Sequence, residues 1–329
     1  MHTSGIVVGG NYVVGPQIGE GGMGVVYEAT QWSLARTVAV KLPRPELCSY
    51  PFVLDRFRTE ALAGSRLRHP NLVSVIDYGH EHGMPFLVTE LVVGRLLGQL
   101  VAHEPLELET IVELGEQVLA ALGEAHAAGV IHGDVKCDNV LVETVRTGLR
   151  ARLIDFGLAS IADAPSLIGA ERILSGTPEY LAPEVIRGEP PTCATDIYAV
   201  GVMLYQLLTG TTPFSGGSTR DLLRRHVTED AIPPSQRARK RPIPQALDEV
   251  VMRALAKDPA ERHEDADACA AALRASRPAI QRRVDRPFEL ALVDTSDTIM
   301  AAYRDLVQSG LLQAYEQTAR APTVALAGT

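Results

Sequence analysis

Two short stretches decide the fold of this chain: residues 132–139 read HGDVKCDN, and residues 155–157 read DFG. The first follows a segment whose apolar side chains recur at three- and four-residue spacing and which ends at Gly129, so we expect a helix and then a loop. The second follows ARLI, an apolar run typical of a buried strand. Both stretches therefore present polar side chains at the ends of buried elements.

The polar side chains of these two stretches suit metal-assisted phosphoryl transfer. Asn139 and Asp155 offer hard oxygen ligands for Mg²⁺. Asp134 can accept the proton of an attacking hydroxyl, and Lys136 can neutralise charge on the transferred phosphoryl group. A DFG tripeptide alone is common in unrelated proteins, so the interpretation depends on what precedes it.

Residues 18–24, which read IGEGGMG, contain Gly19, Gly21 and Gly24 in a G-x-G-x-x-G pattern. Such a loop lets backbone amides approach phosphates without obstruction by side chains. A Gly-rich hairpin turn and a Rossmann phosphate turn are the alternatives. The Rossmann turn needs a helix after the glycines, whereas the VVYEAT that follows here is typical of a strand. The pattern favours a phosphate-binding lid between two antiparallel strands.

The next buried-strand pattern, VAVK, ends at Lys41. A lysine in a strand is usually solvated at an edge, but one placed shortly after a lid can reach a polyphosphate as a point charge. Its flexible side chain needs an anion to hold it. Glu60 in the helical stretch FRTEALAGSRL is the natural candidate, although a glutamate on a helix is ordinarily solvated.

Composition limits the other functions that the chain could have. The 329 residues carry a net charge of −9, which disfavours a nucleic-acid or anionic-membrane partner. No run of about 18 apolar residues and no secretory signal are visible, so we expect no membrane span and a cytoplasmic location. The four cysteines lack metal or disulfide spacing and are Cys48, Cys137, Cys193 and Cys269.

Secondary-structure signals change along the chain. From Tyr12 to about Leu91, short β-branched runs alternate with Gly and Pro, with one helical stretch between Pro51 and Leu67. From about Leu96 the periodicity becomes helical, with helices expected at 108–128, 195–209, 219–226, 245–256 and 266–275. This arrangement indicates a small β-rich lobe joined to a larger helical lobe.

Taken in this order, the lid, the lysine, the loop and the DFG stretch resemble the eukaryotic-type (Hanks-type) serine/threonine protein kinases. The wording GEGGMGVVYEA and RHPNLVSVIDYG looks like the bacterial branch of that family. The resemblance implies an α+β, two-lobed protein-kinase fold, with a small antiparallel β-rich N-lobe that holds one key helix and a larger, mainly α-helical C-lobe. It also implies that ATP binds between the lobes with Mg²⁺, for which Mn²⁺ can substitute.

The resemblance gives expected domain boundaries. Residues 1–11 would be an N-terminal extension, and residues 12–277 the kinase domain, with the N-lobe over about 12–91 and the C-lobe over about 92–277. Residues 278–329 would form a tail with an amphipathic helix at about 297–309. The apolar face of that helix either packs back on the main body or recruits a protein partner.

The same resemblance assigns roles in catalysis. Lys41 would hold the α- and β-phosphates and pair with Glu60, Asp134 would be the catalytic base, and Lys136 would contact the γ-phosphate. Thr177 would contact Asp134 and Lys136, as in kinases that act on Ser and Thr. Asn139 and Asp155 would be the Mg²⁺ ligands.

Nucleotide-binding residues are implied in the same way, as a lid, a pair of surfaces around adenine, a gatekeeper and the backbone of the segment between the lobes. The lid is Ile18, Gly19, Glu20, Gly21, Gly22, Met23 and Gly24; the adenine surfaces are Val26, Ala39 and Leu141; the gatekeeper is Thr89; and the backbone contacts come from Glu90 and Val92.

Three matches outside the ATP site make the resemblance more specific, and the first of them points to a protein substrate. SGTPEYLAPE at residues 175–184 resembles the end of a kinase activation segment, which small-molecule phosphotransferases usually lack. Asp196 resembles the residue that anchors the catalytic loop, and Glu184 and Arg262 occupy positions of a buried ion pair. We expect transfer to protein Ser or Thr, and keep a pseudokinase-like docking scaffold as the alternative.

One position departs from the family pattern. The family usually has Arg before the catalytic Asp, where it clamps a phosphate on the activation segment, and here the residue is Gly133. We therefore expect the segment from Asp155 to Glu184 to fold without a phosphate. Ser166 and Ser175 are our candidates for modification before Thr177.

Overall fold

A computed structural model describes the main body of the chain. The chain divides into two units, residues 1–281 and residues 282–329, and all described residues belong to the first. The described residues are 6–21, 24–47, 50–103, 105–156, 159–161, 177–238, 241–277 and 279–280. The helix expected at about 297–309 lies outside these residues.

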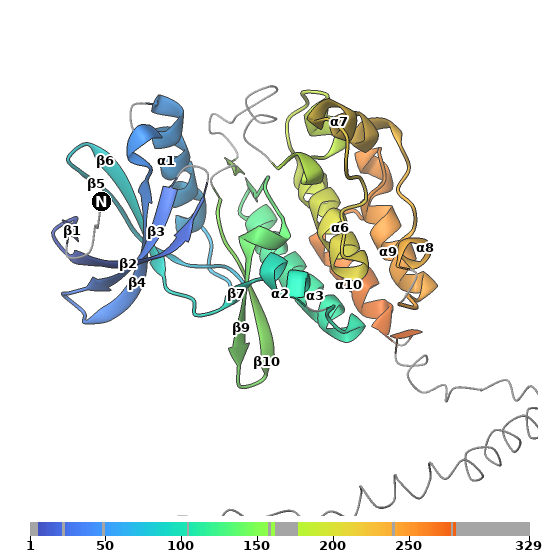
Figure 1. Ribbon diagram of the computed structural model, residues 1–329, viewed down its shortest axis with the longest axis horizontal. Helices are drawn as coiled ribbons and strands as arrows, with labels where there is room; N and C mark the ends of the chain where they lie inside the picture. Colours follow the sequence, from blue (N-terminus) through green and yellow to red (C-terminus); the bar gives the residue numbers. More distant parts are fainter. Residues whose placement is uncertain are drawn as a thin grey trace, which may run out of the picture. The chain divides into compact units, whose positions relative to one another are not determined.

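The N-terminal part is a six-stranded antiparallel sheet with strand order β1-β2-β3-β4-β6-β5 (Figure 1). The β-branched runs expected to be strands are strands. One more strand, β1, lies before the expected start of the lobe and pairs with the beginning of β2. The strands are β1 (Val7–Val8), β2 (Tyr12–Glu20), β3 (Gly24–Gln31), β4 (Arg36–Pro43), β5 (Val75–Glu81) and β6 (Met84–Glu90).

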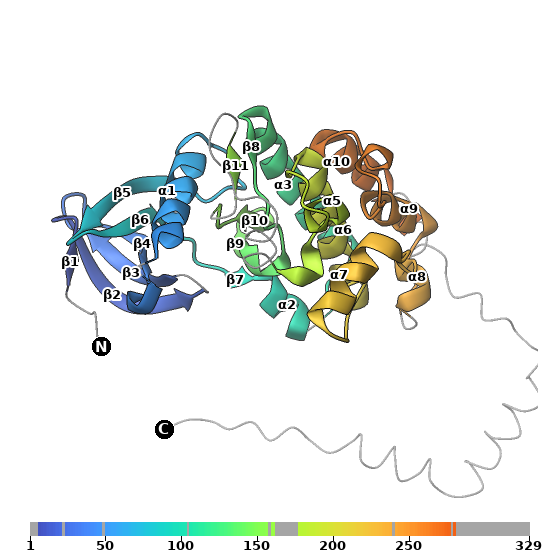
Figure 2. The ribbon, with the colours of Figure 1, turned by 90° about the horizontal axis from the view of Figure 1, so that it is seen from above.

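One helix, α1 (Pro51–Ser65), packs against β5 and β6 (Figure 2). Pro at the first helical position suits its start, because proline has no amide hydrogen to leave unpaired there. Val53, Phe57 and Ala61 recur every four residues, so they share one face, and they pack around Leu87 of β6 in a small apolar cluster. The expected helix of the N-lobe is thereby confirmed, and its packing fixes Glu60 beside the sheet.

The C-terminal part is helical, as expected, and is built around α6 (Cys193–Thr209). This helix lies between α3 (Leu108–Ala127) and α9 (Gln245–Ala254) (Figures 1 and 2). Thr192 and Thr195 form a capping box at its start, and Gly210 ends it at a φ of 79°. The other described helices are α2 (Leu97–His103), α5 (Pro183–Ile186), α7 (Thr219–Thr228), α8 (Pro234–Arg237) and α10 (Ala266–Ala275), with 3-10 turns η1 (Pro45–Leu47), η2 (Cys137–Asn139), η3 (Pro178–Tyr180) and η4 (Pro259–Glu261).

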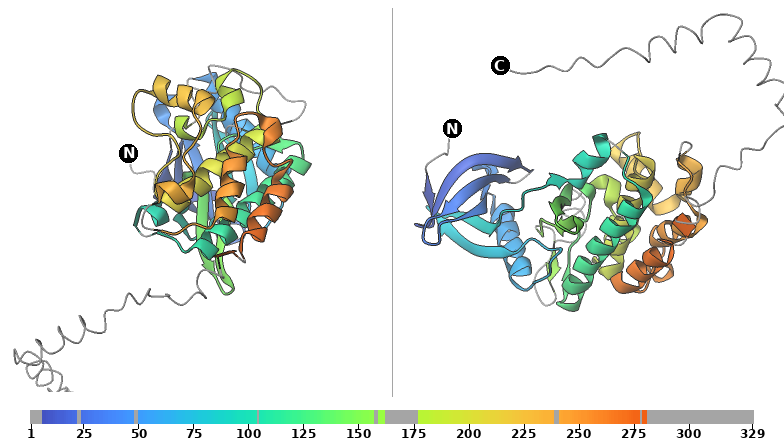
Figure 3. Two further views of the ribbon diagram at one scale, coloured as in Figure 1. Left: turned by 90° about the vertical axis from the view of Figure 1, so that its right-hand side faces the viewer. Right: turned by 90° about the horizontal axis from the view of Figure 1, so that it is seen from below.

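A β-hairpin in the C-lobe was not expected in full. Strands β9 (Val140–Val145) and β10 (Gly148–Leu153) lie between the N-lobe sheet and the helices (Figures 1 and 3). The sequence indicated only the end of β10, as ARLI, because Glu143 and Arg150 interrupt the apolar pattern before it. Three two-residue strands pair locally, and they are β7 (Arg95–Leu96), β8 (Val130–Ile131) and β11 (Ser160–Ile161). Among the described helices, none is long and apolar enough to cross a membrane.

The expected ion pair between Glu184 and Arg262 is present and buried. Two hydrogen bonds of 2.7 Å join the guanidinium to the carboxylate, and the side chains are 3% and 0% exposed. Arg262 also donates to the backbone oxygens of Ala194 and Ala256. Burial alone would raise the pKa of Glu184, but the hydrogen bonds and charge of Arg262 hold it below its usual value. The pair therefore ties α5 to the start of α6 and to η4.

Replacing Arg262 by Ala leaves the Glu184 carboxylate buried without a partner. We expect the free energy of unfolding to fall by about 3–5 kcal/mol at neutral pH. Because the folded-state pKa of Glu184 is depressed, the loss should shrink as the pH falls below about 4.3 and the carboxylate takes up a proton.

Denaturant unfolding of the variant and of the wild-type protein measures this effect. Arg274→Ala is the matched control, since that arginine pairs with Glu116 at 3.3 Å with a side chain that is 65% exposed. If Arg262→Ala and Arg274→Ala lowered the free energy of unfolding by the same amount, burial of the Glu184–Arg262 pair would add nothing to its contribution, which would contradict the prediction.

Candidate active site

Lys41 of β4 lies at the centre of a cluster of charges. Its Nζ is 3.0 and 2.8 Å from the two carboxylate oxygens of Glu60 and 3.4 Å from Oδ1 of Asp155. Burial alone would lower the pKa of Lys41, but the charges of Asp155 and Glu60 outweigh it and raise the pKa. The lysine is therefore charged at neutral pH, and it joins the N-lobe sheet and α1 to Asp155, two residues after the end of β10 in the C-lobe.

The lid is formed by the ends of β2 and β3. Gly19 lies opposite Val26, and the amide of Gly21 donates to the backbone oxygen of Gly24 at 2.9 Å. A Cβ at Gly24 would lie 2.7 Å from the backbone oxygen of Leu42, so no larger residue fits there. Gly22 and Met23, expected at the tip of the lid, lie outside the described residues.

Residues expected around adenine meet through the register of the sheet. Val26 lies opposite Lys41, and Ala39 lies opposite Thr89. Leu141 comes from β9 of the C-lobe and pairs with Leu96 of β7. The lid residues Ile18 and Glu20 are exposed. Glu90 and Val92, in the segment between the lobes that we call the hinge, are half-buried.

The catalytic-loop residues form a connected set of hydrogen bonds. Lys136 Nζ donates to Oδ2 of Asp134 at 2.8 Å and to the hydroxyl of Thr177 at 2.7 Å. The amide nitrogen of Asn139 donates to the backbone oxygen of Asp134 at 2.8 Å and to Oδ2 at 3.0 Å. The Thr177 hydroxyl itself lies 3.4 Å from Oδ1 of Asp134. The structure thus brings together all four residues that the sequence placed in the loop and in the segment beyond it.

The carboxylate of Asp196, near the start of α6, anchors the backbone of this loop. Its fully buried carboxylate accepts hydrogen bonds from the backbone amides of His132, at 2.9 Å, and Gly133, at 2.8 Å. The ring of His126, at the end of α3, contacts the same carboxylate at 2.8 Å. Burial alone would raise the pKa of Asp196, but these partners hold it below its usual value. The loop is therefore anchored to two helices through one carboxylate.

The donors available to a metal ion fit Mg²⁺. Asn139 turns its amide nitrogen to Asp134, so its oxygen is the atom that it can offer, and Asp155 adds a carboxylate. Within the described ranges, no three His, Cys, Asp or Glu side chains lie close enough to hold an ion by themselves. Mg²⁺ commonly takes one or two protein ligands and completes its shell with phosphate oxygens and water, so this donor set fits a metal that arrives with a nucleotide.

Asp155 and Gly133 both adopt left-handed backbone conformations, with φ of 66° and 75°. Glycine reaches this region without steric cost, whereas an aspartate there stores strain of about 1–3 kcal/mol. The neighbouring Phe156 ring packs on the ring of His132 at 4.6 Å between centroids. Strain at Asp155 is thus held in place by packing on the catalytic loop; Gly157 lies outside the described residues.

Residues 12–273 match the protein kinase domain family. The chain belongs to that family. This kinase domain is 43% identical over 271 residues to the serine/threonine-protein kinase pkn3 of Myxococcus xanthus, and the alignment covers 80% of this chain and 49% of pkn3. It is 38% identical over 261 residues to the serine/threonine-protein kinase PknB of Mycobacterium leprae, covering 78% of this chain and 41% of PknB. These relatives confirm the bacterial Hanks-type branch.

Among solved structures, the crystal structure of the Mycobacterium tuberculosis PknI kinase domain aligns with a TM-score of 0.64 and 26% identity. That alignment covers 83% of this chain and 98% of the PknI kinase domain, and it confirms the two-lobed fold. The chain spans about half or less of the length of the curated relatives that it matches.

Sequence reasoning missed His126 as part of the site. The signal available was a histidine in the last turn of a predicted helix that leads into the catalytic loop, which by itself is common. Burial would lower the pKa of His126, but the hydrogen bond and charge of Asp196, with a contribution from Cys193, raise it to about 10. Charged His126 therefore stabilises the folded state.

Replacing His126 by Gln tests this contribution through its pH dependence. Because the pKa is about 10 in the folded state and about 6.5 in the unfolded state, the stabilisation is complete below about pH 6.5 and is lost as the pH rises towards 10. The stability difference between wild type and variant, measured by denaturant unfolding, should shrink across that range.

The control is His103→Gln, an exposed histidine at the end of α2 whose loss should give a small difference. A difference for His126→Gln that stays constant with pH would contradict a charged imidazole.

Proposed function

We propose that the chain is an ATP-dependent protein kinase that transfers the γ-phosphate of ATP to Ser or Thr hydroxyls. The observation that carries the proposal is the contact of Lys136 with both Asp134 and Thr177. Asp134 would accept a proton from a hydroxyl. Thr177 comes just before η3 and belongs to the stretch 175–184, which resembles the substrate-docking end of a kinase activation segment. A base, a cation and a substrate-binding segment therefore meet at one point.

Each side chain can be given a part in the reaction. The substrate hydroxyl would lie within reach of Asp134, which takes up its proton as the oxygen attacks the γ-phosphorus. Lys136 would compensate charge on the phosphoryl group, and Lys41, held by Glu60, would orient the α- and β-phosphates. Asn139 and Asp155 would hold Mg²⁺, which supplies positive charge against the phosphate oxygens. The nucleotide would enter between the lid and the residues proposed for the adenine surfaces.

A pseudokinase scaffold is the competing function. Loss of the lysine, the base or the metal-binding aspartate would favour a scaffold. Lys41, Asp134 and Asp155 are all present, and Nζ of Lys41 lies 3.4 Å from Oδ1 of Asp155. We therefore favour catalysis. A cytoplasmic location and a protein partner for residues 278–329 stay predictions from the sequence.

The proposed activity should not depend on phosphorylation of the chain. With Gly133 before the catalytic base, no arginine side chain stands there to bind a phosphate. The backbone of Gly133 is held instead by Oδ1 of Asp196. Anchoring of the loop by a buried carboxylate needs no added charge.

Asp134→Asn should lower kcat by about 10²- to 10⁴-fold, because the variant cannot take up the hydroxyl proton. Binding of ATP, measured separately by titration, should persist. Asp138→Asn, an exposed aspartate in the same loop, is the matched control and should keep turnover near wild type. Unchanged turnover in Asp134→Asn would refute the assignment of the base.

Treatment of the purified protein with a phosphatase tests the second part of the proposal. We expect phosphoryl transfer to a protein substrate to change by less than about tenfold, which corresponds to a barrier change below about 1.4 kcal/mol. Mass spectrometry before and after treatment establishes that phosphate was removed. A larger loss of activity on dephosphorylation would show that a phosphate orders the site.

A further inference from the structure

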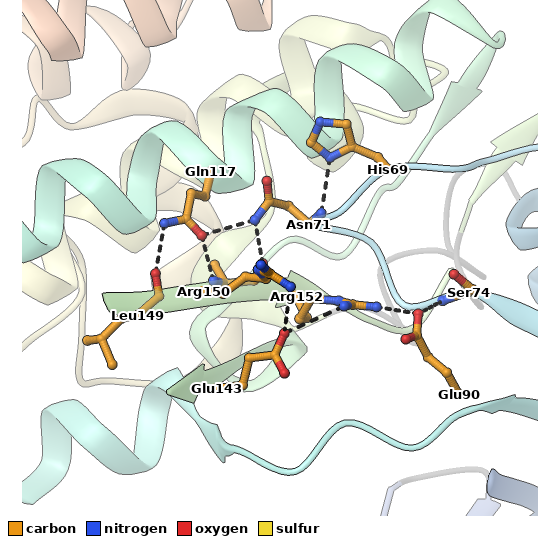
Figure 4. Close-up of polar contacts among 10 residues, drawn as sticks. His69, Asn71, Ser74, Glu90, Gln117, Glu143, Leu149, Arg150 and Arg152 are labelled. Carbon is orange, nitrogen blue, oxygen red and sulfur yellow. Dashed lines mark hydrogen bonds and ion pairs between the residues drawn. The ribbon is translucent and has the colours of Figure 1, made fainter. Parts of the chain in front are cut away.

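The carboxylate of Glu90, at the end of β6, binds the loop between α1 and β5. Its Oε1 accepts the backbone amide of Ser74 at 2.7 Å, and the amide of Glu90 donates to the backbone oxygen of Ser74 at 3.0 Å. These reciprocal bonds, of which Figure 4 draws the one made by the carboxylate, join the last residue of β6 to the loop that precedes β5. The carboxylate of Glu90 therefore bonds to this loop, whereas the backbone of Glu90 is proposed to bind adenine.

Arg152 of β10 reaches the same carboxylate from the C-lobe. Figure 4 shows its guanidinium between two acidic side chains, with one nitrogen on Glu90 and another 3.5 Å from Oε1 of Glu143. The side chain of Arg152 is 10% exposed, so most of its charge is removed from water. Burial of a guanidinium is costly unless its partners stay in place, which makes the position of Glu90 depend on Arg152.

A second set of bonds fixes β10 to the same loop. Asn71 donates to the backbone oxygen of Ala151 at 2.8 Å and to the side-chain oxygen of Gln117, in α3, at 3.0 Å. Gln117 bonds in turn to the backbone of Ala151 and of Leu149. The backbone of Leu153 pairs with the loop at both its amide and its oxygen. The loop behind the hinge is therefore part of the C-lobe framework, and Arg152 extends that framework to the hinge strand.

Arg152 also lies beside the proposed adenine site. In the hairpin it is directly opposite Leu141, so the two side chains share one face with Cβ atoms about 5 Å apart. Leu141 is one of the residues proposed to contact adenine. Arg152 therefore contacts two parts of the proposed adenine site, Glu90 through an ion pair and Leu141 as its cross-strand neighbour. It is not one of the residues proposed to act in phosphoryl transfer.

We propose that Arg152 is a positioning residue for the nucleotide, which fixes the hinge strand to the C-lobe and so sets the affinity for ATP. This inference rests on the proposed function, from which it takes ATP as the ligand. The contacts of Arg152 are those described above and do not depend on that function. With the pair intact, the backbone of Glu90 and Val92 is ordered before the nucleotide arrives. Without it, binding has to order that segment, and the affinity falls by the cost of doing so.

Arg152→Gln tests the proposal, with Arg150→Gln as the matched control. Arg150 lies on the same strand and pairs with the same Glu143 at 3.6 Å, but its side chain is 40% exposed and it is not among the residues bonded to Glu90. We expect Arg152→Gln to raise KM for ATP and Kd for ADP about tenfold and to change kcat by less than about threefold. Arg150→Gln should leave all three near wild type.

Arg152→Lys keeps the charge but cannot bridge Glu90 and Glu143 with a planar fork, so its KM and Kd should fall between those of wild type and Arg152→Gln. This variant also carries the test if Arg152→Gln does not fold. A wild-type KM in a folded variant, or a loss of kcat at constant KM, overturns the proposal.

Binding of ADP separates this inference from the proposed function. A chain that transfers no phosphate but binds ADP more weakly in Arg152→Gln contradicts the proposed kinase activity and supports the role of Arg152. Equal Kd for ADP in wild type, Arg152→Gln and Arg152→Lys overturns the role of Arg152, whatever the activity.

Discussion

The geometry of the catalytic loop depends on one buried carboxylate, that of Asp196. It accepts two backbone amides, from His132 and Gly133, together with the ring of His126, so that α3, α6 and the loop meet at two oxygens. A fully buried carboxylate is stable only with such a set of donors. The position of Asp134 follows from this anchor, because it is the next residue along the loop. Fixed polar groups of this kind act on a reaction without reorganising during it.

Among the described residues, two ion pairs outside the catalytic loop join the two lobes. Lys41 of the N-lobe pairs with Asp155, which follows β10, and Arg152 of β10 pairs with Glu90 of the hinge strand. Arg152 is part of β10 and Asp155 lies two residues after the end of that strand, so β10 and the short segment that follows it contact the N-lobe at the proposed adenine site and at the proposed phosphate site. A disturbance of β10 should therefore be felt at both ends of the nucleotide. The two lobes are thus coupled through β10, a strand that the sequence pattern indicated only in part.

How far the sequence predicted the structure depended on whether a residue's role was local. The helix from Leu108 and the strand ending at Lys41 follow from apolar periodicity, which is a property of neighbouring residues. The pairing of Lys41 with Glu60 was inferred from order along the chain. His126 and Arg152 could not be assigned in this way, since a histidine in a last helical turn and an arginine in a strand gain their roles only from partners brought close by folding. Glu143 and Arg150 interrupt the apolar pattern of β9 and β10, so periodicity indicated only the end of that hairpin.

The central claim is that a buried carboxylate, and no phosphate, orders the catalytic loop. Its most direct test is the rate of phosphoryl transfer by Asp196→Asn in dephosphorylated protein, compared with wild type at saturating ATP. The account predicts a fall of about 100-fold or more in kcat with the Kd for ATP within about threefold of wild type, because the neutral amide holds the two backbone donors poorly while the nucleotide contacts persist. A variant that folds, binds ATP and turns over at the wild-type rate would contradict the account.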